Sequence, residues 1–474
     1  MSFSEEYFND DYDGYLNDDD VKSKVKLCKE YVSDGQTFAY LDNIEDTIQL
    51  CMEYDLTEDG IYLTDAVLEI APYNSEFWQF KGIFLNNMFN FEEAYRCFIK
   101  AISLNPNDVE TLINKSIAED NLGLFDEAVE SLQRALVIEP NNEETLFSLG
   151  VLFERKEKFD EAVEYFTKAA TLEPEYSEAW YELGFCYENM DSLHKALEAY
   201  DNFLNIEPNN FTGWYNKGIV YIRLEEYEKA VNSFELSIAL KDDFASSWFN
   251  CGYANSRLNR INEALNCYKK AYEIDKYDET ILYSMGQAYE ELGNLNKAIK
   301  YYSLAIKLDE EYYEAFLARG YCYDGVGKYQ LALKDFNKAI TLTNDPTDAW
   351  SAKADLEYSL GNLQEAIACY KSASTSDPKN IDVLTKLAET YVEIGNWLEA
   401  LDIYEQCIVL KPGHADFYYA KAKINFLLSR TQEAIDALKA AYVLNPEIKD
   451  EFAREYPDVK ASKLYIRLIE DNKS

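Results

Sequence analysis

The stretch Trp180-Tyr-Glu-Leu-Gly-Phe-Cys-Tyr187, followed by Ala196, Tyr200 and Pro208, decides the fold of this chain. Its final landmark, proline, recurs at a constant spacing of 34 residues. A self-similar unit of this length is typical of a stacked array of helix-turn-helix repeats, in which each repeat contacts mainly its neighbours. The series runs through Pro72, Pro106, Pro140, Pro174 and Pro208, and it resumes in phase at Pro378, Pro412 and Pro446.

Two columns of small residues confirm this register where proline is missing. Small residues at fixed points let two helix backbones approach closely, and we expect the bulky residue four positions before each eighth residue, such as Trp180, to fill the groove beside it. The twentieth position of each unit holds Ala94, Ala128, Ala162, Ala196, Ala230, Ala264, Ala298, Ala332, Ala366, Ala400 and Ala434. The eighth holds Gly82, Ser116, Gly150, Gly184, Gly218, Gly252, Gly286, Gly320, Ala354, Ala388 and Ala422.

The pattern Trp180-x-x-Leu183-Gly184-x-x-Tyr187, with Ala196, Tyr200 and Pro208, resembles the tetratricopeptide repeat (TPR) signature. The resemblance covers residues 75 to 448 as eleven consecutive units. It implies an all-α fold, a right-handed superhelical solenoid of helix-turn-helix repeats, whose first helices line a concave face.

Four segments follow from this register. Residues 1–20 form an acidic and aromatic stretch without a basic residue, and we expect a disordered tail that either only solvates the chain or docks a partner. Residues 21–74 are predicted to be a helical cap with a degenerate repeat, because Ile48 and Gly60 replace the small eighth residue and the alanine. Residues 75–448 are the array, and residues 449–474 are predicted to be capping helices.

The amino-acid composition limits the classes of partner that the chain is expected to bind. The 45 basic and 87 acidic side chains give a formal charge of −42, which opposes binding to nucleic acid or to anionic lipid. The first residues, MSFSEEYFND, resemble no signal peptide, and no apolar run approaches the roughly 20 residues of a membrane span, so we expect no membrane insertion and a cytoplasmic protein. Several of the 9 cysteines fall at interior repeat positions, and the cysteines are predicted to be reduced and structural.

The residues that an active site needs are scarce. The 2 histidines, His194 and His414, lie far apart, and no C-x-x-C occurs, so a local metal site is not expected. The run GYCYDGVGKYQ around Gly325 and Gly327 lacks the first glycine and the Ser/Thr of a phosphate loop. We therefore expect no catalytic residue, no cofactor and no enzyme activity.

The first helices offer candidate binding residues. Aromatic residues at the fifth and ninth positions form a stripe that either contacts a ligand or packs between repeats. Asparagines at the sixth position form a partial column, which Glu182 interrupts. This column resembles the asparagine ladder that holds a peptide backbone in the TPR superhelix of O-linked N-acetylglucosamine transferase. The stripe comprises Phe147, Tyr181, Tyr215, Phe249, Tyr283, Phe185 and Tyr253, with Tyr321 in the same ninth column, and the ladder Asn114, Asn216 and Asn250.

Charges on the same helices exclude one familiar binding mode. Chaperone-binding TPR domains hold a terminal carboxylate with basic residues, whereas the second position here is acidic in most units, for example Glu178 and Asp416. The thirteenth position carries Arg155, Arg223 and Arg257, which either meet a ligand or pair with acids such as Glu188.

These features predict a non-enzymatic scaffold that binds a peptide segment of a partner protein, with basic residues, on its concave face. Two alternatives remain open at this point. One is an accessory or substrate-recruiting subunit of a separately encoded enzyme, such as a glycosyltransferase complex. The other is a self-assembling structural protein.

Overall fold

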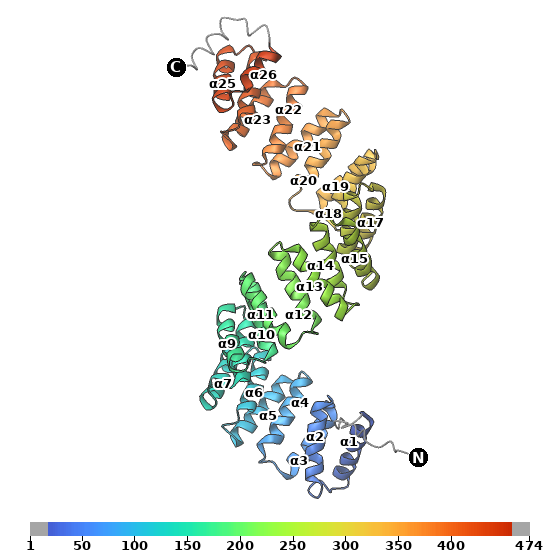
Figure 1. The fold of residues 1–474 in the computed structure, drawn as a ribbon, viewed down its shortest axis with the longest axis vertical. Coiled ribbons are helices and arrows are strands. Elements are labelled where there is room, and N and C mark those ends of the chain that lie inside the picture. The colour runs from blue at the N-terminus through green and yellow to red at the C-terminus, as the bar shows by residue number, and fades with distance from the viewer. Residues whose placement is uncertain (1–17, 457–474) are drawn as a thin grey trace, which may run out of the picture. The chain divides into compact units, whose positions relative to one another are not determined.

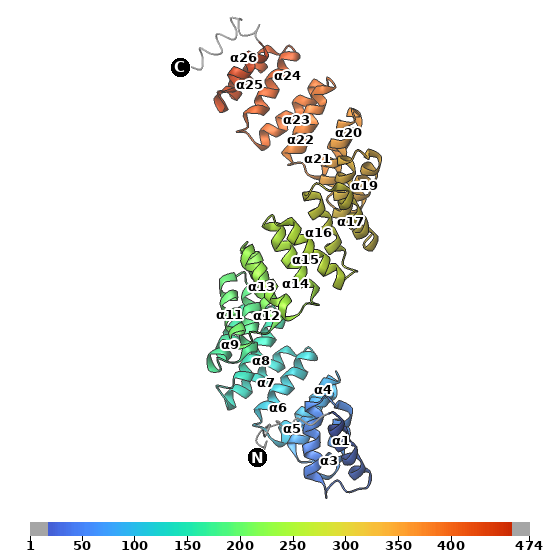
Figure 2. The same ribbon diagram turned by 45° about the vertical axis from the view of Figure 1, so that its right-hand side comes forward.

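The computed structural model describes residues 18–456, and within them the chain forms 26 α-helices and no strand. These residues divide into two compact units, of which the first ends at Lys241 and the second begins at Asp242. Within each unit, consecutive helices lie side by side along the chain (Figures 1 and 2). The predicted all-α array of helix-turn-helix repeats is confirmed.

The first unit contains thirteen of these helices. They are α1 (Asp18–Ser33), α2 (Leu41–Glu53), α3 (Thr57–Ile70), α4 (Ser75–Asn87), α5 (Phe91–Leu104), α6 (Val109–Asn121), α7 (Phe125–Ile138), α8 (Glu143–Arg155), α9 (Phe159–Leu172), α10 (Ser177–Asn189), α11 (Leu193–Ile206), α12 (Phe211–Arg223) and α13 (Tyr227–Leu240).

The described part of the second unit contains another thirteen. They are α14 (Ala245–Arg257), α15 (Ile261–Ile274), α16 (Glu279–Glu291), α17 (Leu295–Leu308), α18 (Tyr313–Gly325), α19 (Tyr329–Leu342), α20 (Thr347–Ser359), α21 (Leu363–Ser376), α22 (Ile381–Glu393), α23 (Trp397–Leu410), α24 (Ala415–Leu427), α25 (Thr431–Leu444) and α26 (Ile448–Glu455).

Each repeat from α4 to α25 pairs a first helix of 13 residues with a second helix of 14 residues. The turn between the two always contains one residue at a positive φ, at the fifteenth position. Glycine supplies it in five repeats, as at Gly123 and Gly327, because glycine adopts this left-handed conformation without steric cost. In other repeats a side chain is forced into it, as at Phe89, where φ is 61°. Gly327 therefore belongs to an inter-helix turn.

The alanines of the twentieth position are fully buried in every repeat from α4 to α25. Many of them share a buried cluster with the tenth residue of the next repeat, as Ala162 does with Cys186 and Ala298 does with Cys322. The second helix of one repeat therefore packs on the first helix of the next through a small side chain.

The glycine column has a different partner from the one that the sequence suggested. A methyl group added at Gly150 would lie 2.4 Å from the Phe166 ring, so the space beside this glycine is filled by the twenty-fourth residue of the same repeat. Tyr200 lies against Gly184 in the same way. The expectation that tryptophan fills this groove is wrong. The indole N–H of Trp180 instead donates to the Pro174 carbonyl at 3.0 Å, and it thereby secures the turn between repeats.

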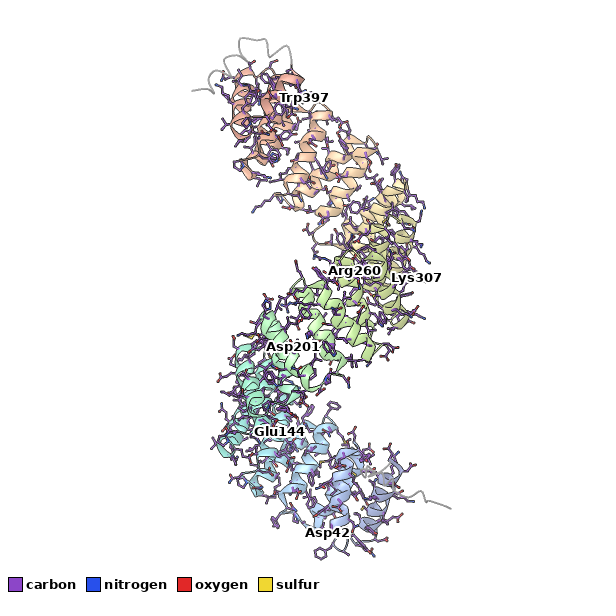
Figure 3. All side chains as sticks on the ribbon, viewed as in Figure 1. Asp42, Glu144, Asp201, Arg260, Lys307 and Trp397 are labelled. Atoms are coloured by element: carbon purple, nitrogen blue, oxygen red, sulfur yellow. The ribbon has the colours of Figure 1, made fainter. Side chains whose placement is uncertain are left out.

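Cations at the seventh position add a polar link between neighbouring helices. Lys217 on α12 pairs with Asp201 on α11, the residue labelled in Figure 3. Arg319 on α18 donates to both carboxylate oxygens of Asp335 at 2.7 and 2.8 Å and to Ser303 of the preceding repeat at 3.0 Å. The bonds of Arg319 are partly buried, so this repeat is tied to its neighbour by polar as well as apolar contacts.

The two ends differ from the repeats. Residues 1–17 of the predicted tail lie outside the described residues, while Asp18, Asp19 and Asp20 form the first turn of α1 and so do not belong to a disordered tail. The helices α2 and α3 span the same repeat positions as a regular pair. At the other end, α26 packs Phe452 against Tyr419 and Phe426, and residues 457–474 lie outside the described part.

Candidate functional site

All thirteen predicted binding residues lie on first helices, and each has accessible surface. We call the surface made by the second, fifth, sixth, ninth, twelfth and thirteenth positions of the first helices the first-helix face. Each unit has its own such face. The first unit carries Asn114, Phe147, Arg155, Tyr181, Phe185, Tyr215, Asn216 and Arg223, and the second carries Phe249, Asn250, Tyr253, Arg257 and Tyr283.

The aromatic residues of the fifth position serve the packing of their own repeats. The Phe147 ring lies 5.4 Å from Phe166, centroid to centroid, and Tyr283 lies 5.5 Å from Tyr302. Tyr181 contacts Phe203 at 5.2 Å. Each of these fifth-position rings is half-buried, so one edge stays accessible on the first-helix face. At the ninth position, Phe185 is 38% exposed. The stripe is thus partly structural, and its role in binding stays a prediction.

The asparagines of the sixth position form hydrogen bonds within the chain. The Asn216 amide donates to the Tyr181 hydroxyl of the preceding repeat at 3.0 Å. The Asn250 amide donates to the Ser246 carbonyl of its own helix at 3.0 Å. An asparagine amide can both donate and accept, which is the chemistry that a ladder along a peptide backbone requires. Binding by an asparagine ladder, including Asn114, stays a prediction.

Two arginines pair with acids of the preceding repeat. Arg155 pairs with Asp120, and Arg223 donates to Asp191 at 2.9 Å and to the Glu188 backbone carbonyl at 2.8 Å. The pairing expected for Arg223 with Glu188 is present, with 3.5 Å between the Arg223 Nη1 and a carboxylate oxygen. Arg257 instead donates to the Tyr253 hydroxyl at 3.2 Å. These contacts turn basic side chains toward the protein and reduce the positive charge that a ligand would meet.

Carboxylates are crowded on the first-helix face of the first unit. Burial, then repulsion by Glu154, raises the pKa of Glu182 to about 7. Burial also raises the pKa of Glu154, whose carboxyl group hydrogen-bonds with Glu182. Glu144 has a raised pKa because of burial and of the charges on Glu110 and Glu143. The Arg155 guanidinium opposes part of the rise in the pKa of Glu154.

The same unit has an acidic hollow of about 410 Å³ that is lined by the two ends of one repeat, residues 143–176. Tyr176 is part of its lining, and burial followed by the charge on Glu178 raises the pKa of this tyrosine above its usual range. A cationic side chain would fit the chemistry of this hollow. Its lining residues are Glu143, Glu144, Glu173, Glu175 and Tyr176.

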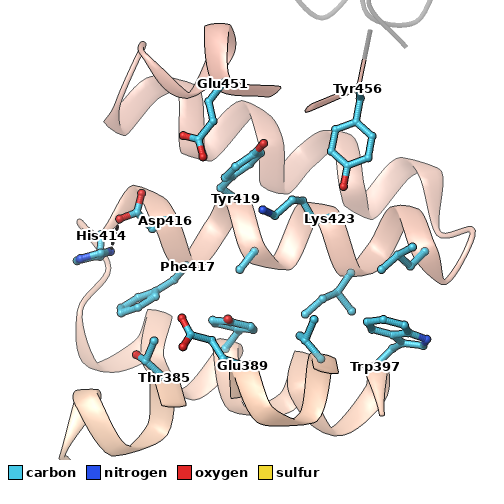
Figure 4. A pocket seen from close by; sticks show the side chains of 15 residues that line it. Thr385, Glu389, Trp397, His414, Asp416, Phe417, Tyr419, Lys423, Glu451 and Tyr456 are labelled. Carbon is cyan, nitrogen blue, oxygen red and sulfur yellow. Dashed lines mark ion pairs between the residues drawn. The ribbon is translucent and has the colours of Figure 1, made fainter. Parts of the chain in front are cut away.

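A larger cavity, of about 570 Å³, lies in the second unit between α22, α24 and α26, and sequence reasoning missed it (Figure 4). Trp397, Phe417 and Tyr419 contribute aromatic walls. Glu389 and Glu451 contribute carboxylates, and burial followed by repulsion from Asp382 raises the pKa of Glu389. The acidic second position and the aromatic residues that follow it on α24 were the available signal.

The basic side chains of this cavity contact neighbouring residues. Lys423 lies over the Tyr419 ring at 4.5 Å and its Nζ is 3.4 Å from a Glu455 oxygen. His414 stacks on Phe417, with 4.3 Å between ring centroids, and its Nδ1 lies 3.7 Å from an Asp416 oxygen, as the dashed line in Figure 4 shows. The cavity therefore combines aromatic surface with carboxylates, and the Lys386 ammonium opposes part of the rise in the pKa of Glu389.

A third cavity, of about 430 Å³, lies on α16 and α18 of the second unit. Tyr283 and Tyr321 line it together with Glu290 and Glu314. The Tyr302 hydroxyl donates to Glu290 at 2.7 Å, which fixes this carboxylate toward the cavity wall. Aromatic and acidic residues are again combined, as in the cavity between α22 and α26.

Within residues 18–456, no group of three or more histidine, cysteine, aspartate or glutamate residues is arranged to hold a metal ion. No helix of that part of the chain is long and apolar enough to span a membrane.

Models of the tetratricopeptide repeat match most of the chain, and the chain belongs to the tetratricopeptide repeat family. Arrays of this family are typically non-catalytic scaffolds for protein interaction. Two models described as tetratricopeptide repeat match residues 75–108, 109–142, 211–244 and 313–346, and residues 147–210 and 385–447. A third such model matches residues 280–312, and one described as TPR repeat matches residues 256–293 and 354–395.

Solved structures with the same repeats are shorter than this chain. MamA is 23% identical, with a TM-score of 0.34 over 34% of this chain and 95% of its own. YrrB, a TPR protein with an unusual peptide-binding site, is 25% identical, with a TM-score of 0.36 over 40% of this chain and 98% of its own. MamA from Desulfovibrio magneticus RS-1 is 19% identical, with a TM-score of 0.35 over 36% and 96%. No curated protein matches the chain.

Proposed function

We propose that this scaffold binds a segment of a partner protein on its first-helix faces, and that the segment carries arginine or lysine side chains beside apolar ones. The crowding of carboxylates on these faces carries the proposal. Burial and mutual repulsion raise the pKa values of Glu144 and Glu182, which means that their ionised forms are destabilised within the chain. A cationic side chain relieves this repulsion and gains an ion pair in a partly buried place.

The cavity between α22 and α26 provides a defined test of this chemistry. Its aromatic walls attract a cation through their π faces and accept the apolar stem of arginine or lysine. Glu389 and Glu451 then face the charge. An acidic segment would meet repulsion here, so the proposed partner differs from the carboxylate-terminated ligands of chaperone-binding TPR domains.

The test uses two double variants that lose the same charge. In Glu389→Gln/Glu451→Gln both changes lie in the cavity, whereas in Glu399→Gln/Glu433→Gln both lie on exposed sites of second helices. A fluorescein-labelled peptide of alternating arginine and leucine is titrated by anisotropy, with the glutamate-leucine peptide as a negative probe. We expect the first variant to bind the basic peptide at least tenfold more weakly than the second. Equal affinities would show that only the overall charge attracts the peptide.

Salt separates the two contributions to binding. The Debye length falls from about 10 Å at 0.1 M to about 3 Å at 1 M salt, so ion pairs at the rim weaken while apolar contact persists. We expect affinity for the basic peptide to fall steeply over this range. An affinity independent of salt would assign the binding to the aromatic walls alone.

Two further expectations concern other partners and the location of the protein. A formal charge of −42 opposes binding to nucleic acid, and we expect the cytoplasm as the compartment. A recruiting subunit of an enzyme complex would use the same faces, whereas a self-assembling array would use its ends. The cavity variants therefore distinguish these two alternatives.

A further inference from the structure

Two thiols meet inside one repeat of the second unit. Cys251 on α14 and Cys267 on α15 have their sulfur atoms 3.7 Å apart. All nine cysteines of the chain lie within residues 18–456 and are free thiols, and Cys267 alone among them is partly exposed. Cys251 is buried, and its sulfur is 3.6 Å from the amide nitrogen of Asn255, which can donate to it.

The repeat architecture explains why these two sulfurs face each other. Cys251 occupies the seventh position of its repeat and Cys267 the twenty-third. The same two positions are joined in other repeats, where Lys115 donates to Ser131 at 2.8 Å and Arg319 to Asp335 at 2.7 Å. The backbone therefore directs these side chains together whatever their chemistry, and in this repeat both are thiols.

Other cysteines at the twenty-third position lack a sulfur partner in their own repeat. Cys97 faces Lys81, and burial raises the pKa of Cys97 to about 11 against the opposing effect of the Lys81 ammonium. Cys369 likewise has Lys353 as its neighbour. These two residues share the backbone position of Cys267, but they are buried and have no sulfur partner in their own repeat, so they are internal controls for the effect of the paired thiols.

We propose that Cys251 and Cys267 form an oxidation site, a dithiol that a peroxide converts into a disulfide between α14 and α15. The Cys267 thiolate, which solvent reaches, attacks one peroxide oxygen and becomes a sulfenic acid as hydroxide leaves. The Cys251 thiolate then attacks the Cys267 sulfur and expels a second hydroxide. The two protons released by the thiols convert both hydroxides to water, so two thiols and one peroxide give one disulfide and two waters.

The step requires little rearrangement. The sulfurs approach from 3.7 Å to a bond length of about 2.05 Å, which rotation about the two Cα–Cβ bonds can bring about. The new bond closes a short loop through the turn between α14 and α15. It joins the helix that carries Phe249 to the helix that carries Tyr268, whose rings already lie 5.7 Å apart. Oxidation thus fixes one segment of the first-helix face.

Trypsin provides a direct readout on the full chain. Cleavage after Lys241, Arg257, Arg260 and Lys269 places Cys251 in peptide 242–257 and Cys267 in peptide 261–269, with one cysteine in each. The reduced protein is treated with equimolar hydrogen peroxide, its remaining thiols are alkylated, and the digest is read by mass spectrometry. We expect the two peptides joined, two hydrogens lighter than their sum, while Cys97 and Cys369 are recovered alkylated.

Controls separate proximity in the fold from general reactivity. The variant Cys267→Ser must show peptide 242–257 with an alkylated Cys251 and no bridge. Peroxide treatment in 6 M guanidinium must lose the preference for this pair. Separate alkylated peptides after treatment of the native protein, or Cys267 recovered as sulfinic acid without a bridge, would overturn the proposal.

Hydrogen exchange tests the structural consequence. Amides of residues 245–274 should exchange at least several-fold more slowly after oxidation and return to the starting rate with dithiothreitol, because the disulfide opposes separation of the two helices. Unchanged or faster exchange in a bridged sample would refute the claim that the bond fixes this segment.

Discussion

The repeat formed by α2 and α3 and the repeat formed by α8 and α9 have helices at the same positions but fill their interiors differently. In the regular repeat, Gly150 leaves space that the Phe166 ring occupies. In the first repeat, the eighth position holds Ile48 and the twenty-fourth holds Thr64, and neither has exposed surface. The larger side chain of the pair therefore lies on the first helix, α2, in this repeat and on the second helix, α9, in the regular repeat.

The contact with the following repeat also differs, because the large side chain lies on the following repeat in one case and not in the other. Ala162 packs with Cys186 of the next repeat, whereas Gly60 faces the ring of Phe84, which would lie 2.3 Å from a methyl group added there. Filled volume is kept across each helix contact, while the identity of the residue at a given position is not. The first repeat therefore departs from the signature without departing from the packing.

The largest expected effect is at the twenty-fourth position. Phe166→Ala removes a fully buried ring and leaves a cavity, so we expect a loss of about 3 to 5 kcal/mol in the local free energy of opening. Thr64→Ala removes a methyl group and the hydrogen bond to the Gly60 carbonyl, at a cost of about 1 kcal/mol. Hydrogen exchange in the mutated repeat measures both. Equal losses would break the comparison.

The next effect concerns the twentieth position. Gly60→Ala places a methyl group against Phe84, and we expect a loss of about 1 to 3 kcal/mol although alanine favours helix by about 1 kcal/mol over glycine. The reverse change Ala162→Gly should cost only about 1 kcal/mol. Thermal and urea unfolding measure each. Adding Phe84→Leu to Gly60→Ala should recover most of the loss, and failure of this rescue would argue against the contact.

The first repeat and the regular repeats also differ in how pH affects their stability. The pKa of Glu182 is raised to about 7, above an unfolded value of about 4.3, so the folded state holds this proton more tightly. The contribution of Glu182 to the free energy of unfolding is therefore largest below about pH 4.3, and it is lost as the pH rises through about 7. Glu182→Gln should therefore increase the free energy of unfolding by about 1 kcal/mol or more at pH 8 and leave it unchanged at pH 4.

Glu45 on α2 is the matched residue for this test. Its pKa is also raised, by burial and then by repulsion from Asp42, but it has no carboxyl partner like Glu154. Glu45→Gln should give a smaller gain at pH 8 than Glu182→Gln. A larger gain for Glu45→Gln would show that the carboxyl pair does not set the pH response.

The smallest effect is expected at the turns. Phe89 has a φ of 61° and an 81% exposed ring, whereas Gly123 occupies the same position of the next repeat with a φ of 77°. Phe89→Gly should raise the free energy of unfolding by up to about 1 kcal/mol because it removes backbone strain. Gly123→Ala should lower it by about 1 kcal/mol. A loss of stability in Phe89→Gly would mean that the exposed ring has a packing role.

The period alone was enough to predict the array. Proline and alanine fixed the register, and all eleven alanines are buried where two repeats meet. The partner of each glycine was not predictable from the small-residue column, because a gap between helices accepts any ring of suitable reach. Trp180 and Tyr200 both qualified by size, and only the structure shows that Tyr200 lies against Gly184.

The site was predicted less completely than the fold. Face and residue type followed from the helical period, but the hydrogen bond from Asn216 to Tyr181 and the ion pair of Arg155 with Asp120 join residues 35 apart. Long side chains reach such partners by rotamer choice, which sequence spacing does not specify. The cavity between α22 and α26 is lined by residues of four helices, α22, α23, α24 and α26, so no single segment revealed it.

The fit of Phe166 against Gly150 bears on how such a chain grows. The Phe166 ring and the Gly150 gap that it fills belong to the same 34 residues, so a duplication or deletion of one full repeat leaves the gap beside each remaining eighth-position glycine filled. The first repeat is not independent in this way, because Gly60 and the Phe84 ring that fills its gap belong to different repeats. Gene duplication can thus lengthen the array within the regular repeats, while the start of the array is inherited as one piece.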